Sequence, residues 1–277
     1  MIYKIGDRVL FCDTMRTNAQ KMLFERYIMI WGFFSTAHII SLLLGAVIIA
    51  VIYLILRGKS DRVKVWTLGI LSFSGICAIV FNLVRWGSPL EYLPLHLCSL
   101  NAMVLPFAVF TRNKTLNNLL LLWSLGALLA LVMNNGVAEA EIFSAVFNFY
   151  YFPHVLEFGI PILMFALKLV KKDVKCILST VAITVCSYTA IHFINLGINS
   201  YTLKYNVLDW AGNVIKVNYM FSITPENPLL ELFYGIIPHS YWYMYLAFII
   251  VFVYLGAIYA SDIVKIIRAK TAGNGER

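Results

Sequence analysis

Charged residues are scarce in this sequence of 277 residues: 13% are Asp, Glu, Lys or Arg, whereas 61% are hydrophobic. Soluble domains carry about a quarter charged and about half apolar residues. A mean hydropathy of +0.79 agrees with this imbalance. The composition therefore excludes an ordinary soluble protein and predicts a polytopic membrane protein with no separate soluble domain.

Several chemical signatures are also missing. The cysteines are scattered, without a CxxC pair, so we predict no disulfide framework. No glycine-rich phosphate loop, HExxH pair or nucleic-acid motif is present, and we predict no cofactor, no bound metal and no nucleic-acid partner. The N-terminal stretch MIYKIGDRVLFCDTMRTNAQ interrupts its apolar residues with charges, so no cleavable signal peptide is expected. The cysteines are Cys12, Cys77, Cys98, Cys176 and Cys186.

Long apolar runs are what the sequence has in abundance. About twenty apolar residues cross a bilayer core, and seven runs approach or exceed that length. They predict an all-α, polytopic transmembrane helix bundle of seven spans within a membrane domain at residues 35–264. The predicted spans are residues 35–56, 65–84, 92–110, 116–133, 145–170, 174–196 and 241–263.

Lys and Arg predict the orientation of the bundle. They concentrate at residues 57–64, 112–114, 168–175 and after residue 264, and they are sparse in the alternate connections. Cytoplasmic loops carry this excess, so the C-terminus, with a tail at 265–277, is predicted in the cytoplasm and the N-terminus outside. Residues 1–34 are predicted to form a tail with an interfacial helix, and residues 197–240 a long outer loop.

Ionisable residues gather toward one predicted membrane face. By the parity of the spans, all five histidines lie toward the outer side, together with Arg85, Glu91 and Glu157. Ionisable groups inside spans are costly and often functional. His38 and His239 are closest to the span ends, so an interfacial role is expected for both.

The fifth span carries a polar stripe. Tyr150, His154 and Glu157 are spaced i, i+4, i+7 and share one helix face. A carboxylate one turn from an imidazole is able to orient it as a catalytic base. The alternative is a polar face that bonds neighbouring helices, and backbone carbonyls freed by Pro153 and Pro161 need partners as well.

The third span contains LPLHLCSL, with an imidazole and a thiol two positions apart. On a regular helix such residues diverge by about 200°, so His96 and Cys98 do not form a same-face pair. Either Pro94 leaves the first turn irregular, or Cys98 takes its base from another helix. His154 lies at comparable depth and is the best candidate for that base. One alternative is a cysteine that only packs against its neighbours. The other is a zinc site formed by His96, Cys98, His154 and His192, but no closely spaced pair of ligands supports it.

Other polar residues are candidates for substrate binding. Arg85, beside Trp86, is either an interfacial anchor or a cation for a lipid phosphate. His192 lies on a stripe with Tyr188 and Asn195, for which a place at headgroup level beside water is preferred. Tyr219, in the aromatic outer loop, belongs either to a headgroup-binding rim or to an ordinary aromatic belt.

The sequence resembles the YwaF-like family of bacterial integral membrane proteins. The resemblance rests on LPLHLCSL, the arginine that closes the preceding span, the histidine deep in the fifth span and the later NYMF. That family is similar to eukaryotic multi-pass proteins that transfer acyl chains between phospholipids through a membrane cysteine and histidine. The resemblance implies a multi-pass protein of the bacterial cell membrane, with Cys98 as acyl acceptor and His154 as its base.

We therefore expect a lipid-modifying enzyme of the acyltransferase or acyl-ester hydrolase type, acting on membrane phospholipids. Its predicted catalytic residues are Cys98, His154, Glu157 and His96. Its predicted substrate-binding residues are Arg85, Asn134, Tyr150, His192 and Tyr219, with His96, Asn134 or Tyr150 as oxyanion donors. The alternatives are a transporter or lipid-binding protein that uses the same polar cluster as a pocket, and an assembly subunit whose polar residues only bond helices. The sequence does not specify an oligomeric state.

Overall fold

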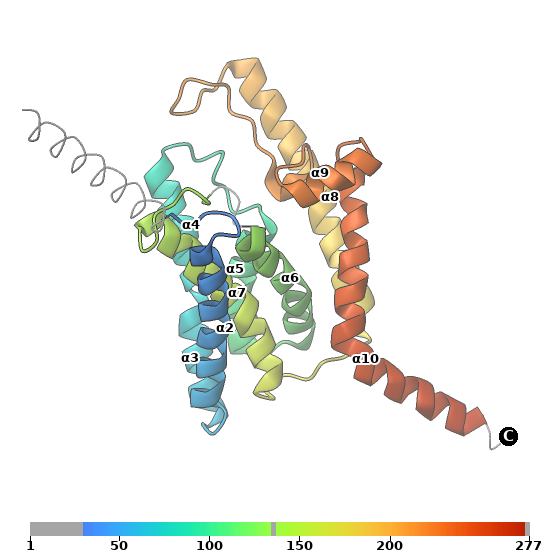
Figure 1. The fold of residues 1–277 in the computed structure, drawn as a ribbon. Helices are drawn as coiled ribbons and strands as arrows, with labels where there is room; N and C mark the ends of the chain where they lie inside the picture. The colour runs from blue at the N-terminus through green and yellow to red at the C-terminus, as the bar shows by residue number, and fades with distance from the viewer. Residues whose placement is uncertain (1–29, 134–136, 275–277) are drawn as a thin grey trace, which may run out of the picture.

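The computed structural model describes residues 30–133 and 137–274. Within these residues the chain is all-α, with two isolated β-bridges and no strand (Figure 1). The predicted fold class is confirmed at this level. The helices are α2 (Thr36–Leu56), α3 (Asp61–Ser72), α4 (Ser74–Trp86), α5 (Leu97–Thr111), α6 (Lys114–Met133), α7 (Ala145–Ala166), α8 (Cys176–Tyr205), α9 (Pro228–Ile236) and α10 (Ala247–Asn274), with short 3-10 turns η1 (Tyr219–Phe221) and η2 (Trp242–Leu246).

Six of these segments are long and apolar enough to cross a membrane. They are α2, the α3–α4 pair, α6, α7, α8 and the η2–α10 pair. The remaining apolar helix, α5, has 15 residues and is about 22 Å long, which is less than the hydrocarbon thickness of about 30 Å. The structure therefore supports a multi-pass helical membrane protein, whereas the count of seven full spans stays a prediction.

The third predicted span differs from the structure at its start. It was expected from residue 92, but α5 begins at Leu97 and residues 92–96 are not helical. Pro94 disfavours helical backbone in the residue before it, and His96 adopts extended backbone as the N-cap, with φ −73° and ψ 155°. His96 therefore lies outside the helix, and Cys98 lies in its first turn.

Three further boundaries differ from the prediction. The second span is broken at Phe73 into α3 and α4. The sixth was expected to end at residue 196, yet α8 continues to Tyr205, because no proline interrupts it before the left-handed cap at Asn206. The last helix continues to Asn274, so most of the predicted cytoplasmic tail is helical.

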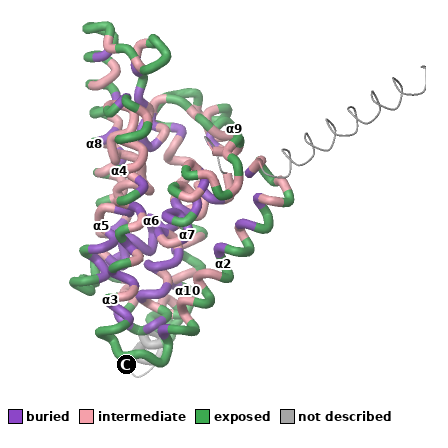
Figure 2. Tube along the Cα trace, turned by 90° about the vertical axis from the view of Figure 1, so that its left-hand side faces the viewer, coloured by how far each residue is buried: buried purple, intermediate pink, exposed green. Residues whose placement is uncertain are grey.

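α7 is the central helix of the bundle. It contacts α2, α3, α4, α5 and α6 (Figure 1). Half of its apolar window is buried within the protein, against 17% for α2 and 11% for the last span, which have faces left for lipid. Buried residues gather in the interior of this bundle, while the ends are exposed (Figure 2). A polar side chain on α7 therefore meets protein rather than lipid.

Tyrosine hydroxyl groups attach α10 to α6. Tyr254 donates to the Leu121 carbonyl at 2.9 Å, and the Tyr259 hydroxyl bonds to Asn118 Oδ1. Asn118 also accepts from the Asp173 backbone N–H. These contacts fix the last span on the bundle near its basic end.

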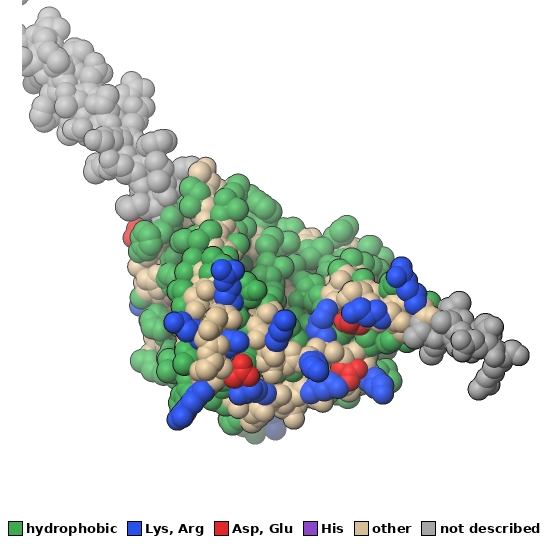
Figure 3. All heavy atoms as spheres, turned by 90° about the horizontal axis from the view of Figure 1, so that it is seen from below, with side chains coloured by type: hydrophobic (Ala, Val, Ile, Leu, Met, Phe, Trp, Pro, Cys, Tyr) green, Lys and Arg blue, Asp and Glu red, His purple; other side chains and the backbone are tan. Residues whose placement is uncertain are grey.

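Lys and Arg side chains gather on one end of the molecule (Figure 3). This end also holds Asp61, Asp173 and Asp262, which pair with Arg112, Lys114 and Lys172 respectively. The hydrogen bond from Lys114 and a second from the Lys175 backbone hold the pKa of Asp173 below its ordinary value. The basic end coincides with the predicted cytoplasmic loops. The predicted N-terminal interfacial stretch, residues 22–34, lies outside the described residues up to residue 29, and residues 30–34 are not helical.

The basic end is predicted to face the cytoplasm. In a cysteine-free background, we expect a cysteine at Lys171 to react with an impermeant maleimide only after the cells are permeabilised. A cysteine at Asn213, in the opposite loop, is expected to react in intact cells. The reverse labelling pattern would contradict the orientation.

Candidate functional site

Cys98, Tyr150 and Glu157 lie in one region at the junction of α5 and α7. The Cys98 thiol interacts electrostatically with Glu157, and Tyr150 interacts with both. His154 lies on α7 between Tyr150 and Glu157, and stacks on the Tyr150 ring with centroids 4.3 Å apart. The structure thus gathers the residues that the sequence placed on two separate spans.

The imidazole of His154 is oriented by the backbone. Its Nδ1 lies 2.7 Å from the Tyr150 carbonyl oxygen. Because a carbonyl only accepts, Nδ1 carries the proton and Nε2 keeps a free lone pair. This contact occupies the position expected for Glu157, whose side chain forms no hydrogen bond to His154 among the described residues. The predicted orienting role of Glu157 is therefore corrected.

Cys98 is half-buried and is a free thiol. Among the described residues, no hydrogen bond joins its sulfur to His154. Catalytic pairs are often loosely arranged before substrate binds and tighten in the complex. The pair is therefore placed in one region, with the imidazole lone pair available, but without direct contact.

One turn deeper on each helix lie two buried polar side chains. Asn101 is 0% exposed and Glu157 is 4% exposed. Asn101 Nδ2 donates to the Glu157 backbone carbonyl at 3.2 Å. That carbonyl has no helical partner, because Pro161 is four residues later and lacks an N–H. We expected carbonyls freed by proline to need partners, and Asn101, which the sequence analysis did not single out, is the partner here.

His96, His192 and Tyr219 form a second group, near the N-terminal end of α5. His96 packs edge-on against Tyr219 at 5.3 Å, and its Nδ1 accepts from the Met220 N–H at 3.4 Å. The Tyr219 hydroxyl donates to the Leu90 carbonyl. Burial raises the pKa of Tyr219 to about 12, so it remains a neutral donor. His96 is thus engaged with the η1 turn.

α8 holds the same turn from its other side. His192 Nδ1 lies 3.0 Å from Ser222 Oγ. Asn195 donates to the Tyr219 carbonyl at 2.8 Å and to Ser222 Oγ at 2.9 Å, and accepts from the Tyr219 N–H at 3.1 Å. The stripe on α8 therefore bonds protein, which is a different role from the headgroup-level position that was expected for it.

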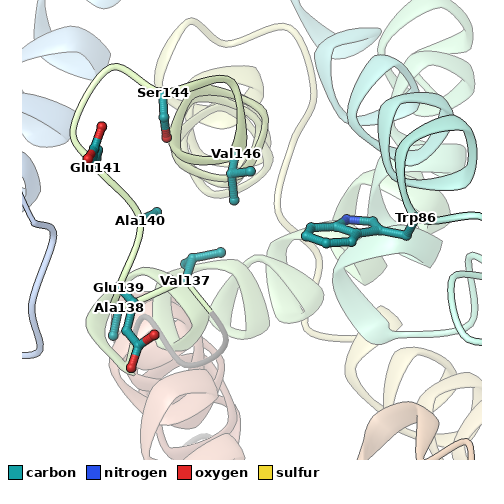
Figure 4. Close-up of a pocket in the computed structure, with 8 residues that line it drawn as sticks. All are labelled: Trp86, Val137, Ala138, Glu139, Ala140, Glu141, Ser144 and Val146. Atoms are coloured by element: carbon teal, nitrogen blue, oxygen red, sulfur yellow. The ribbon is translucent and has the colours of Figure 1, made fainter. Parts of the chain in front are cut away.

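Arg85 is exposed at the end of α4. Its guanidinium lies over the Trp86 ring at 5.1 Å and the Phe81 ring at 5.9 Å. Trp86 also lines a pocket of about 600 Å³, whose other walls come from residues 137–141 and the start of α7 (Figure 4). Val146, one turn before Tyr150, lines this pocket. Arg85 itself does not line this ligand-sized hollow, but its neighbour in the sequence, Trp86, does.

The remaining predicted residues have different outcomes. Asn134 lies outside the described residues. The Tyr150 hydroxyl donates to the Ala130 carbonyl at 2.9 Å, so that proton is already committed. His38, expected at the interface, is fully buried, with Nε2 at 2.8 Å from the Leu131 carbonyl and Nδ1 accepting from the Phe34 N–H. It joins the start of α2 to the end of α6.

Two residues at the α5–α7 junction were missed by sequence reasoning. Asn101 is polar inside a span and three residues from Cys98, which is a usable signal. Gly75 of α4 lies so close to the junction that a Cβ there would be 2.5 Å from Glu157 Oε1. No single-sequence pattern marks that contact. Within the described ranges, no three His, Cys, Asp or Glu side chains gather as a metal site.

The fold and the polar junction define a multi-pass helical membrane protein in which Cys98 and Glu157 lie near Tyr150, on whose ring His154 stacks inside the bundle. The TMEM164 family model matches residues 33–259. The chain therefore belongs to the TMEM164 family. No curated protein and no solved structure matches the chain. The YwaF-like resemblance stays a prediction.

The η1 turn is expected to depend on Asn195. Replacing Asn195 by Ala leaves the N–H of Tyr219 unpaired in a buried place and leaves its carbonyl with only the Ser222 N–H, 3.4 Å away, among the described residues. We expect the free energy of unfolding in detergent to fall by about 2 kcal/mol. The exposed substitution Asn213→Ala is the control and is expected to change it by less than about 0.5 kcal/mol. Equal stability of the two variants would contradict this role.

Proposed function

We propose that the chain is a lipid-modifying membrane enzyme that transfers or hydrolyses an acyl group of a phospholipid through Cys98, with His154 as its base. The observation that carries the proposal is the proximity of Cys98, Tyr150 and Glu157 inside the bundle, with His154 stacked on Tyr150 and its Nε2 without a hydrogen bond among the described residues. Buried ionisable groups inside membrane spans are costly, so such a cluster favours a chemical role.

The first half of the reaction forms a thioester. His154 Nε2 takes the thiol proton while the Cys98 sulfur attacks the ester carbonyl carbon. The carbon–oxygen bond to the glycerol breaks, and His154 returns the proton to the leaving oxygen. In the second half, a hydroxyl attacks the thioester, its proton passes to His154, and the carbon–sulfur bond breaks. The proton then returns to the Cys98 sulfur, which restores the enzyme.

The pocket at Trp86 suits the polar part of a phospholipid. Its volume of about 600 Å³ is within the range of small-molecule sites. The Arg85 guanidinium lies 5.1 Å from the Trp86 ring that lines the pocket, and it offers a cation for a phosphate. Glu139 and Glu141 are exposed at the lining, so the interior favours a neutral or cationic group over a second anion. Val146 leads from this pocket along α7 to Tyr150 and His154.

The proposal predicts an acyl adduct on Cys98. After incubation with phospholipid vesicles, intact-protein mass spectrometry is expected to show one acyl chain added to the protein. Peptide mapping is expected to place it on Cys98. Cys98→Ser is expected to abolish lipid turnover, and His154→Gln to slow it by about 10² to 10⁴-fold, as for loss of a general base.

Cys186→Ser is the matched control, since Cys186 is an exposed cysteine of another span. It is expected to retain wild-type turnover. An unmodified Cys98 in the wild type, with full activity in Cys98→Ser, would overturn the mechanism. Lipid movement across vesicles that survives loss of Cys98 would favour a transporter instead.

A further inference from the structure

Two buried oxygen atoms at the α4–α5–α7 junction have no hydrogen-bond partner. They are Asn101 Oδ1 and Glu157 Oε2, and none of the described residues reaches either one. Buried polar atoms are nearly always paired, and each exception calls for an explanation such as a ligand. Neither atom takes part in the thioester chemistry above.

The position of Asn101 Oδ1 is fixed. Asn101 Nδ2 points at the Glu157 carbonyl that Pro161 leaves free. Because the amide nitrogen is held there as a donor, the oxygen cannot exchange places with it. The acceptor is therefore presented to the junction and is not an arbitrary orientation of the amide.

Both side chains lean toward the layer of Cys98 and His154. Asn101 follows Cys98 by three residues on α5, and Glu157 follows His154 by three residues on α7, a rise of about 4.5 Å in each helix. Helical side chains tilt toward the N-terminus of their helix. The two helices run in the same direction, because Lys114, just after α5, pairs with Asp173, after α7. The electrostatic interaction of Glu157 with Cys98 agrees with this tilt.

α4 closes the junction on the Glu157 side. A Cβ at Gly75 would lie 2.5 Å from Glu157 Oε1 and 2.5 Å from Ala102 Cβ. The absence of a side chain at Gly75 thus makes the room in which the carboxyl lies. The second oxygen, Oε2, remains available on the carboxyl.

We propose that Asn101 Oδ1 and Glu157 Oε2 hold a hydroxyl group, from water or from an acceptor alcohol, beside the Cys98 thioester. A water molecule donates two hydrogen bonds, one for each oxygen, and an alcohol donates one. This rests on the proposed acyl transfer and assigns the second half of it. The held hydroxyl attacks the thioester carbonyl, its proton goes to His154, and the acyl–sulfur bond breaks.

The test follows decay of the Cys98 adduct by quenched-flow intact mass spectrometry, in vesicles with and without lysophospholipid. Glu157→Leu is expected to form the adduct and to lose it at least about 10-fold more slowly than the wild type. Glu157→Gln keeps an acceptor oxygen in the same shape and is expected to decay within about 3-fold of the wild type. Wild-type decay in Glu157→Leu, or loss of adduct formation in that variant, would overturn the proposal.

The lysophospholipid arms separate the two sources of the hydroxyl. Decay to free fatty acid at the same rate in both arms identifies water. Decay that requires lysophospholipid, with a two-chain product, identifies the acceptor alcohol. Either result supports a hydroxyl held at this junction, provided that Glu157→Leu slows it.

Gly75→Ala supplies an independent displacement of the carboxyl and is expected to slow decay as Glu157→Leu does. Gly69→Ala is its control, since a Cβ there meets the Phe110 ring at 2.3 Å and does not touch the carboxyl. The Cys98 adduct of Gly69→Ala is expected to decay at the wild-type rate. Slow decay in both glycine variants would attribute the effect to packing and overturn the assignment.

If the wild-type protein forms no acyl adduct, the proposed acyl transfer is overturned. The hydroxyl site is then tested separately, by the melting temperatures of the wild type, two single variants and the double variant. A shared hydroxyl couples Asn101→Leu and Glu157→Leu, so the double variant is expected to lose less than the sum of the two single losses. The Asn101 Nδ2 bond goes to the backbone and is unaffected by the side chain at 157. Additive losses would overturn the site.

Discussion

The hydrogen bond from Asn101 to the Glu157 carbonyl is the contact on which the polar interior of this bundle depends. In hydrocarbon an unpaired carbonyl is costly, and Pro161 leaves one on the central helix. Asn101 satisfies it at 3.2 Å and thereby joins α5 to α7. This bond also brings the helical turns of Cys98 and His154 to the same level, because each residue is three positions from one end of the bond.

The second polar group serves a different purpose. His96, His192 and Asn195 hold the η1 turn against α5 and α8 through side-chain and backbone contacts. The turn carries left-handed backbone at Met220, with φ 51°, a conformation that needs such support. The connection between α8 and α10 is therefore attached to the start of α5 beside Cys98. The start of α5 thus contacts both groups: Cys98 belongs to the proposed site, and His96 holds the η1 turn.

Sequence reasoning found the class of the fold because it rests on strong local signals, and the pairing of Cys98 with His154 stays a prediction. Apolar runs locate helices, and ionisable residues in spans stand out against them. It raised an irregular start of the third span at Pro94 only as one of two alternatives, and it missed the extended α8, since helix ends depend on capping that hydropathy does not report. It also assigned the orientation of His154 to Glu157, whereas the Tyr150 carbonyl provides it. Gly75 was not predictable, because its role arises from the approach of α4 to α7.

The proposed chemistry requires that His154 activates Cys98 within the bundle. Cys77, on α4, is more exposed than Cys98 and provides an internal reference. The most direct test is the rate of alkylation of each cysteine by a membrane-permeant maleimide, resolved by peptide mass spectrometry. We predict that Cys98 reacts faster than Cys77 despite its burial and that His154→Gln removes this advantage. A Cys98 that reacts more slowly than Cys77 in the wild type, or at an unchanged rate in His154→Gln, would contradict the claim.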